Sequence, residues 1–472
     1  MEDIKTSENK KQKSMDLTVG HPLKQILLFA LPLVFGTMFQ QLYSFADTVI
    51  VGRCLGIDAL AAVGATYSLH FLILGFVQGA CVGFGIPLAQ SFGAGEKREL
   101  HRFLWNGFWV GSFFSVLLTV GTVILAAPLM AAMNTPENIF ADAYCYISLI
   151  SLGMVANVFY NLFSAYLRAV GNSKMPLFFL VLSACLNVVL DLVFIINFQM
   201  GVAGAAWATN LSQAISAVLC AVYIYKKVPS LVPEKRHWRI HRGDTRFQLA
   251  TGIPMALQFA ITSSGTMVMQ SAINLFGSEA VAAYTAAGKI HSLLTQGMVA
   301  MGQTMAVYSG QNYGKGDAAR IRQGVRAALV IEVIYSLVSA VIVYSALEPS
   351  LGLFFSGEVD LTAMMPWART YITICTLFYV PLCTIFIFRN TMQGCGYGFL
   401  PMMGGVVELV ARLAAAVVAM NIHSYWLACA CDPAAWVGAG VFTGVSYLYV
   451  MNKVQKSLGA GMPSHGLSEK QH

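Results

Sequence analysis

The chain has 472 residues and a formal net charge of +7; 57% of its residues are hydrophobic and only 11% are charged. A soluble domain carries about 25% charged residues, so this composition excludes a chain that is surrounded mainly by water. The longest polar stretches, at residues 1–21, 226–246 and from 453 onward, have about twenty residues each and leave no room for a soluble catalytic domain. The composition predicts an all-α integral membrane protein.

Twelve apolar windows follow one another along the chain. A helix needs about 20 mainly apolar residues to cross roughly 30 Å of hydrocarbon. The windows predict spans at 26–50, 59–88, 103–128, 139–166, 176–198, 202–225, 248–276, 280–308, 324–347, 365–390, 400–420 and 423–451. The predicted domains are a tail (1–22), an N-lobe (23–225), a basic linker (226–247), a C-lobe (248–452) and a second tail (453–472).

The Lys and Arg residues fall into alternate loops between these windows. Of the 29, only Arg53, Lys289, Arg369 and Arg412 lie elsewhere when Arg389 is counted as a loop residue. Cytoplasmic loops retain positive charge, whereas translocated loops carry little of it. The pattern therefore predicts that both termini lie in the cytoplasm.

Short motifs recur in the two halves at a nearly constant offset. The pairs are Gly56–Ala62 with Gly277–Ala283 and Ala89–Gly95 with Gly310–Gly316, each 221 positions apart, and Leu167–Gly171 with Met392–Gly396, 225 apart. Independent motifs at one offset indicate a tandem duplication. Each half holds six predicted spans, an even number, so we expect two parallel six-helix repeats that form two lobes around a central cleft.

The repeated motifs resemble those of the multidrug and toxic compound extrusion (MATE) family of the MOP flippase superfamily. The resemblance extends from about Pro22 to Asn452, and its most specific matches are Ala46–Gly52 and Asn187–Asp191. It implies a monomeric efflux transporter of the bacterial cytoplasmic membrane. Such a protein exports lipophilic or cationic compounds in exchange for Na⁺ or H⁺ by alternating access, without a cofactor, an enzymatic activity or a nucleic-acid partner.

Two acidic residues, Asp47 and Asp191, lie inside apolar windows. A charged carboxylate there costs roughly 2.5–3.5 kcal/mol on insertion scales, so each needs a compensating partner. Asn187 shares a helix face with Asp191, and Thr209 in the sixth window adds a hydroxyl. Such oxygens suit a hard monovalent cation or a shared proton, and the resemblance places the family's cation site at these four residues. The alternative is that Asp47 caps or snorkels and that Asp191 hydrogen-bonds to nearby backbone.

Pro32 lies in the same window as Asp47 and removes one backbone hydrogen bond. The resemblance implies that this helix bends there upon protonation, while the alternative is a proline tolerated near a helix end. The C-lobe has Val268 or Met269 where Asp47 would be repeated, so cation binding is not expected there. Glu408 and Arg412, four residues apart in the eleventh window, are expected to form a structural charge pair.

Adaptable aromatic and methionine side chains are expected to line the substrate cleft, although most methionines in such a protein simply pack helices. The candidates are Met38, Phe39, Tyr43, Tyr160, Met267, Met298 and Met301. Membrane lipids are further expected partners, because the basic linker suits anionic headgroups.

Two other functions were weighed against efflux. A flippase for lipid-linked saccharides shares the superfamily but is expected to line its cleft with several arginines, whereas Arg412 alone lies deep in a window. A membrane-embedded enzyme needs a convergent nucleophile and base. His70 and His291 are far apart in sequence, and no H-E-x-x-H or G-x-S-x-G motif occurs.

Two further patterns are interpreted as structural. The ten cysteines are scattered without a C-x-x-C pair, which indicates core residues and predicts no metal site beyond one for Na⁺. The Gly-x-Gly elements at Gly93 and Gly95 and at Gly314 and Gly316 lack the preceding strand and the following Lys-Ser/Thr of a phosphate loop. We interpret them as turns that end helices.

Overall fold

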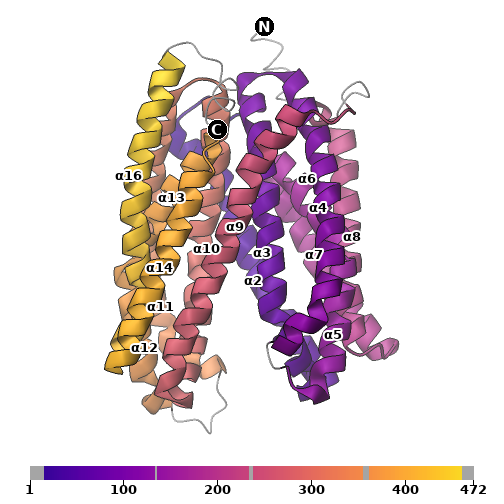
Figure 1. The fold of residues 1–472 in the computed structure, drawn as a ribbon, viewed down its shortest axis with the longest axis vertical. Helices are drawn as coiled ribbons and strands as arrows, with labels where there is room; N and C mark the ends of the chain where they lie inside the picture. Colours follow the sequence, from indigo (N-terminus) through magenta and orange to yellow (C-terminus); the bar gives the residue numbers. More distant parts are fainter. Residues whose placement is uncertain (1–14, 133–134, 233–237, 355–360, 460–472) are drawn as a thin grey trace. The chain divides into compact units, whose positions relative to one another are not determined.

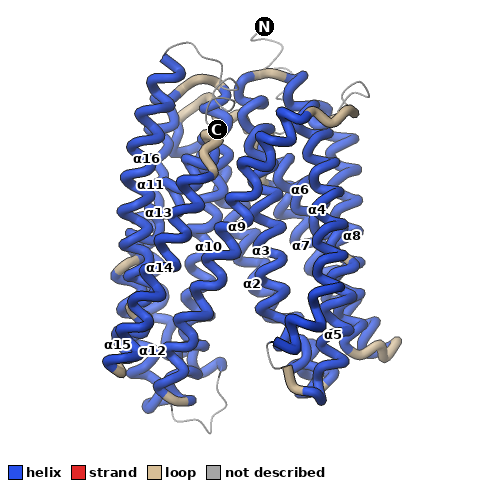
Figure 2. The backbone as a smooth tube through the Cα atoms, in the orientation of Figure 1, coloured by secondary structure: helices blue, strands red, loops and turns tan. Residues whose placement is uncertain are grey.

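The computed structural model of the protein describes residues 15–132, 135–232, 238–354 and 361–459. Within these ranges the regular structure is helical and contains no strand (Figures 1 and 2). The long helices are α2 (Pro22–Leu55), α3 (Ile57–Ala94), α4 (Lys97–Ala132), α5 (Glu137–Leu152), α6 (Met154–Ala169), α7 (Lys174–Leu192), α8 (Val202–Lys227), α9 (Arg242–Ile273), α10 (Ser278–Gly314), α11 (Ala318–Phe354), α12 (Leu361–Leu377), α13 (Tyr379–Gly394), α14 (Phe399–Ile422) and α16 (Cys431–Gly459). The short elements are the π-helix η1 (Val193–Asn197), the 3-10 helices η2 (Pro229–Leu231) and η4 (Asn274–Phe276), and α15 (Tyr425–Cys429).

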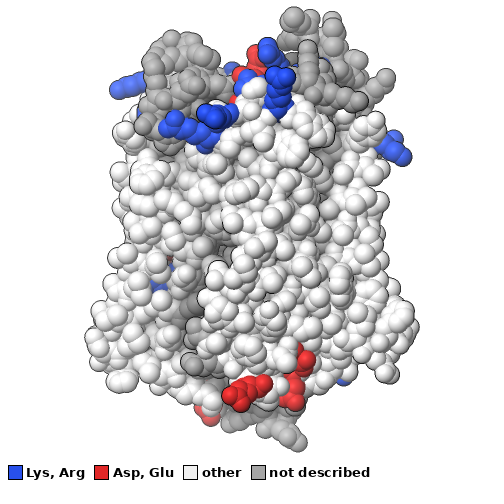
Figure 3. Space-filling model, turned by 45° about the vertical axis from the view of Figure 1, so that its right-hand side comes forward, with Lys and Arg blue, Asp and Glu red and all other residues white. Residues whose placement is uncertain are grey.

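These helices account for the twelve predicted spans. Eight are long and apolar enough to cross a membrane, and two bent pairs, α5 with α6 and α12 with α13, pass the same test together. The remaining two, α9 and α10, have 32 and 37 residues, more than the roughly 20 needed to cross the hydrocarbon core. On the face shown in Figure 3, Lys and Arg gather at one end, and only a few charged atoms show in the broad band across the middle. The prediction of an all-α membrane fold is confirmed.

The last predicted span, 423–451, is displaced along the chain. The helix that crosses is α16, and the short α15 precedes it with a break at Ala430. The Ser424 side chain caps α15 by accepting a hydrogen bond from the Leu427 N–H (3.4 Å). Because both helices are apolar, the hydropathy pattern did not reveal the break between them.

The duplication is also visible in the backbone. The axes of α5 and α6 differ by 46° at a break at Gly153, and those of α12 and α13 by 48° at Phe378, 225 positions later. Gly95 and Gly316 are both left-handed (φ 76° and 82°), and the N–H of the residue after each donates to the carbonyl five residues back (3.0 and 2.9 Å). This is the hydrogen-bond pattern of a helix-ending turn, as predicted for the Gly-x-Gly elements.

The chain divides into two compact units. Unit 1 contains residues up to Asp16 and Leu31–Ala256, and unit 2 contains Leu17–Ala30 and the chain from Leu257 onward. The first part of α2 therefore belongs to unit 2 and the first part of α9 to unit 1, so the units differ from the predicted lobes in these two segments. Pro32 and Pro254 lie close to the residues at which α2 and α9 pass from one unit to the other, and the two prolines are 222 positions apart. The division into two tails, two lobes and a linker stays a prediction.

Polar side chains and glycines explain why α9 begins in unit 1. The buried Gln248 side chain accepts a hydrogen bond from Asn106 Nδ2 (2.7 Å) and donates to the Phe103 carbonyl (3.0 Å). One turn further along α9, a Cβ on Gly83 would lie 2.4 Å from the Gly252 Cα, so only glycines allow α3 and α9 to approach this closely. Small residues serve helix contacts in membranes in this way.

The segment before α2 also passes from unit 1 to unit 2, and hydrogen bonds hold it to each unit in turn. Met15 N–H donates to the Gly171 carbonyl in unit 1 (3.1 Å), whereas Leu17 N–H donates to Gln311 Oε1 in unit 2 (3.0 Å). Arg320 Nη2 donates to the Val19 carbonyl (2.9 Å). These bonds fix the start of α2 on the turn between α10 and α11.

Candidate cation site

The four residues predicted to bind the cation lie together in unit 1. Asn187 and Asp191 are fully buried on successive turns of α7, Asp47 is half-buried on α2, and Thr209 lies on α8. The carboxyl groups of Asp47 and Asp191 lie close enough to share a hydrogen bond when one of them is protonated. In the amide orientation that satisfies its neighbours, Asn187 Nδ2 donates to Asp191 Oδ2 (3.1 Å), and its oxygen lies 3.3 Å from Thr209 Oγ1.

A change of helix type directly follows Asp191. The α-helix α7 ends at Leu192 and continues as the π-helix η1, where Phe198 N–H donates to the Val193 carbonyl five residues back (3.1 Å). Such wide turns often occur at functional sites because they change the direction of the side chains around them. No motif or pattern along the chain predicted this turn.

Each of the two carboxyl groups keeps one open oxygen. Asp47 Oδ1 and Asp191 Oδ1 are buried and have no hydrogen-bond partner among the described residues. A direct hydrogen bond between two carboxyl groups requires one proton, because an ionised carboxylate only accepts. The arrangement can hold a proton in this bond, or it can offer its oxygens to a hard cation such as Na⁺ when the proton is absent.

Two tyrosines complete the site. Tyr43, predicted for the substrate cleft, lies one turn before Asp47 and hydrogen-bonds to the Thr209 side chain. Tyr146 on α5 is 4% exposed and lies within electrostatic range of Asp47 and Asp191. Sequence reasoning missed Tyr146, although the repeat could have revealed it, because the offset of 225 that relates α5 to α12 pairs it with Tyr371.

Unit 2 carries a buried charged cluster at the equivalent place. Arg412 lies 225 positions after Asn187, on the repeat partner of α7. Its Nε donates to Asp432 Oδ1 (2.7 Å), and its Nη2 donates to Glu408 Oε1 (3.0 Å), so the predicted Glu408–Arg412 pair is present. A permanent guanidinium thus stands where unit 1 has the amide of Asn187.

Arg389 extends this cluster and corrects a prediction. It was counted as a loop residue, but it lies within α13, is 5% exposed, and places Nη1 3.6 Å from Glu408 Oε2. Together with Arg412, Glu408 and Asp432 it forms a cluster of two bases and two acids. The sequence placed Arg389 at the end of a window but did not show that Glu408 on another helix compensates its charge.

Gly265 on α9 makes room for this cluster. A Cβ there would lie 2.1 Å from Arg412 Nη1, so we expect Gly265→Ala to displace the guanidinium and to destabilise the protein by about 1–3 kcal/mol. Thermal unfolding in detergent measures the effect. Gly405→Ala on α14 is the control, because its Cβ would meet its nearest neighbour at an ordinary 3.4 Å. Equal melting temperatures for the two variants would contradict the assigned role of Gly265.

The other residues predicted for the substrate cleft lie in different surroundings. Met38 and Phe39 are half-buried on α2. Tyr160 is 7% exposed in the core of unit 1, where its hydroxyl donates to the Pro176 carbonyl (3.3 Å), and Met298 and Met301 are buried in unit 2. The side chain of Met267 lies outside the described residues. The assignment of these residues to a cleft stays a prediction.

The repeated helical halves and the acidic pair buried inside them define a polytopic membrane transport protein. The family model MatE matches residues 32–193 and 254–418, which is most of the chain. The protein therefore belongs to the MATE family of multidrug efflux transporters.

Several relatives support this assignment. The probable multidrug resistance protein YpnP of Bacillus subtilis is 31% identical over 312 residues, covering 66% of this chain and 69% of the relative. The probable multidrug resistance protein NorM of Thermotoga maritima is 25% identical over 427 residues, 88% of each chain. The solved outward-facing conformation of a multidrug resistance MATE family transporter of the MOP superfamily has the same fold (TM-score 0.85, 23% identity, 95% of this chain and 99% of the other).

Proposed function

We propose that this protein exports lipophilic cationic compounds in exchange for H⁺ or Na⁺, and that Asp47, Asn187, Asp191 and Thr209 form its coupling site. The observation that carries the proposal is the close approach of the Asp47 and Asp191 carboxyl groups, each with one buried oxygen that has no partner among the described residues. Ionisable groups inside a membrane are rare and expensive unless they serve function.

In the proposed cycle, the charge of the pair selects between the ion and the drug. With a proton or Na⁺ bound, the pair carries less negative charge and attracts a cationic substrate weakly. Once the ion leaves, the restored negative charge favours the substrate again, so the two compete and are exchanged. Alternating access then exposes the site to the two sides of the bacterial inner membrane in turn, with both termini in the cytoplasm.

The charged cluster of unit 2 supports a single coupling site per molecule. Arg412 holds a fixed positive charge between Glu408 and Asp432, so no mobile cation is needed there. The same pairing weakens the alternative of a saccharide flippase. That function calls for arginines free to bind phosphate, whereas Arg389 and Arg412 both face Glu408.

Uptake of a fluorescent lipophilic cation into inverted proteoliposomes tests the proposed function. A pH gradient and a Na⁺ gradient are imposed separately, with equal membrane potential. We expect uptake driven by one of the two gradients, which names the coupling ion. Uptake under neither gradient, by protein that is folded and correctly inserted, would reject cation-coupled efflux.

Pro32 and Pro254, near the points where α2 and α9 pass from one unit to the other, are expected to affect the transport rate. Each removes a backbone hydrogen bond where α2 or α9 passes from one unit to the other, so both are expected to serve as bending points. Pro32→Ala and Pro254→Ala should lower the transport rate severalfold while leaving substrate affinity within about twofold. Pro128→Ala, an exposed position inside α4, is the control. Equal rates for all three variants would contradict the bending role.

A further inference from the structure

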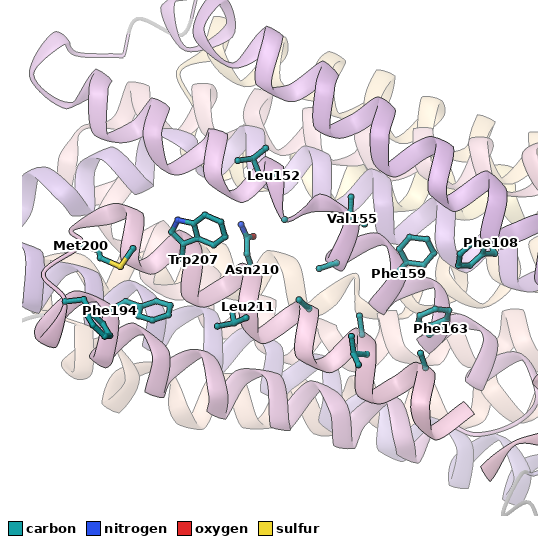
Figure 4. Close-up of a pocket in the computed structure, with 17 residues that line it drawn as sticks. Phe108, Leu152, Val155, Phe159, Phe163, Phe194, Met200, Trp207, Asn210 and Leu211 are labelled. Carbon is teal, nitrogen blue, oxygen red and sulfur yellow. The ribbon is translucent and has the colours of Figure 1, made fainter. Parts of the chain in front are cut away.

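A groove runs along unit 1 between α6 and α8, with a volume of about 890 Å³ (Figure 4). On α8 it is lined at intervals of three or four residues, by Trp207, Leu211, Ala214, Val218 and Ala221, which places these side chains on one helix face. From the first to the last of these residues α8 rises about 21 Å, roughly two-thirds of the hydrocarbon thickness. The groove is open along its side, since Trp207 is 44% and Val218 is 61% exposed.

The lining of the groove is almost entirely apolar. Phe159 and Phe163 on α6 and Phe108 on α4 form one end of its wall, and none of the lining side chains is charged. The amide of Asn210 is already engaged, because its Nδ2 donates to the Leu149 carbonyl (2.6 Å) at the break between α5 and α6. The groove therefore has no acidic side chain to pair with a cation, and its shape and composition fit a hydrocarbon chain.

A chain of aromatic rings leads from this end of the groove to the basic linker. Phe159 contacts Phe108 (5.1 Å between ring centroids), Phe108 contacts Trp105 (5.7 Å), and Trp105 contacts Trp238 (4.2 Å). Trp238 is held in place by Trp109, whose Nε1 donates to its carbonyl (3.3 Å). Interfacial aromatic rings of this kind mark the level of the lipid headgroups.

The same end of the groove is positively charged. Beyond Ala221, the groove face of α8 continues to Tyr225, which is 73% exposed, and the helix ends with exposed Lys226 and Lys227. Arg239, directly after Trp238, is exposed as well. No Asp or Glu occurs in α8, so these cations have no acidic partner within that helix.

We propose that this groove binds one anionic phospholipid of the membrane. One acyl chain lies between α6 and α8, and the phosphate headgroup lies near Lys226, Lys227 and Arg239. A zwitterionic lipid offers the same chains but no net charge, so the site prefers the anionic headgroup. The proposal is separate from the coupling site, because none of the four residues Asp47, Asn187, Asp191 and Thr209 lines the groove.

Native mass spectrometry of the purified full chain with phosphatidylglycerol or phosphatidylcholine tests this site. We expect one phosphatidylglycerol to bind at least tenfold more tightly than phosphatidylcholine. The triple variant Lys226→Gln/Lys227→Gln/Arg239→Gln should lower phosphatidylglycerol binding to the phosphatidylcholine level and leave the latter unchanged. Equal affinity of the unaltered protein for both lipids would overturn the proposal, as would one-for-one displacement of the lipid by a lipophilic cation.

A variant that fills the groove distinguishes a lipid bound in the groove from lipid that only contacts the protein surface. Val218→Trp should abolish retention of the lipid, whereas Val341→Trp, at a similarly exposed valine on α11 (66% against 61%), should not. Quenching by phosphatidylglycerol with brominated chains provides a second readout that needs no groove-filling variant, because Trp207 lines the groove. Trp207→Phe should remove the saturable part of the quenching. Unchanged lipid retention in folded Val218→Trp, or unchanged saturable quenching in Trp207→Phe, would contradict the site.

Discussion

Replacing Asp191 by Asn is expected to reduce gradient-driven export to the level of empty liposomes. The amide is nearly the same size, so the packing of α7 is kept, but an amide cannot release a proton or regain a negative charge. The pair of carboxyl groups then no longer becomes more negative when the ion leaves, so ion and substrate no longer exclude each other. Uptake of a lipophilic cation into inverted proteoliposomes, driven by the gradient that supports the unaltered protein, measures the loss.

Two comparisons make this result specific to the site. Asp142→Asn, on an exposed acid of α5, should transport at the normal rate. Asp47→Asn should match Asp191→Asn, and the double variant should be no worse than either single one, because the carboxyl groups act as one unit. Normal export by folded Asp191→Asn would rule out this pair as the coupling site.

Arg412→Met is expected to have the largest effect on stability, a loss of about 3–5 kcal/mol. Methionine removes the guanidinium but leaves Glu408 and Asp432, whose side chains are 7% and 14% exposed, with much of their charge uncompensated. Arg389 remains, but only at 3.6 Å from Glu408. Thermal unfolding of the purified protein in detergent measures the change.

The matched control is Arg369→Met. Arg369 is 63% exposed and lies 4.0 Å from Glu348, which is 73% exposed, so its removal should change the stability by no more than about 1 kcal/mol. Adding Glu408→Gln to Arg412→Met should recover part of the lost stability, because it removes one of the acids left without a partner. An Arg412→Met protein as stable as Arg369→Met would show that the cluster of unit 2 is not structural.

Much of the fold could be predicted because its signals are local. An apolar window is sufficient to indicate a spanning helix, and the repeated glycines of the helix-ending turns fixed the register of the duplication. That register could also have located features that the sequence analysis did not use. Pro254 follows from Pro32 at the offset of 222, and Tyr371 follows from Tyr146 at 225. The break between α15 and α16 was missed because both helices lie in one continuous apolar window, although Asp432 and Pro433 follow Ala430 closely.

A site residue could be predicted from the sequence only where its own type was unusual for its position. Asp47, Asp191 and Arg412 stand out because charge inside an apolar window is expensive. Arg389 lies near a window end, where charge is ordinary, and the roles of Arg389 and Asp432 depend on partners brought close by the tertiary fold. Likewise, the passage of α2 and α9 from one unit to the other depends on contacts such as Gly83 with Gly252, which no local pattern encodes.

Proton release upon substrate binding tests the central claim most directly. The purified protein is mixed with tetraphenylphosphonium in weakly buffered detergent solution without Na⁺, and a pH-sensitive dye reports the protons set free. If the substrate competes with a proton held between Asp47 and Asp191, the unaltered protein should release about one proton per bound cation, since competition through one site is reciprocal. Asp47→Asn and Asp191→Asn should release none. Equal proton release from the unaltered protein and both variants would show that the coupling proton is held elsewhere.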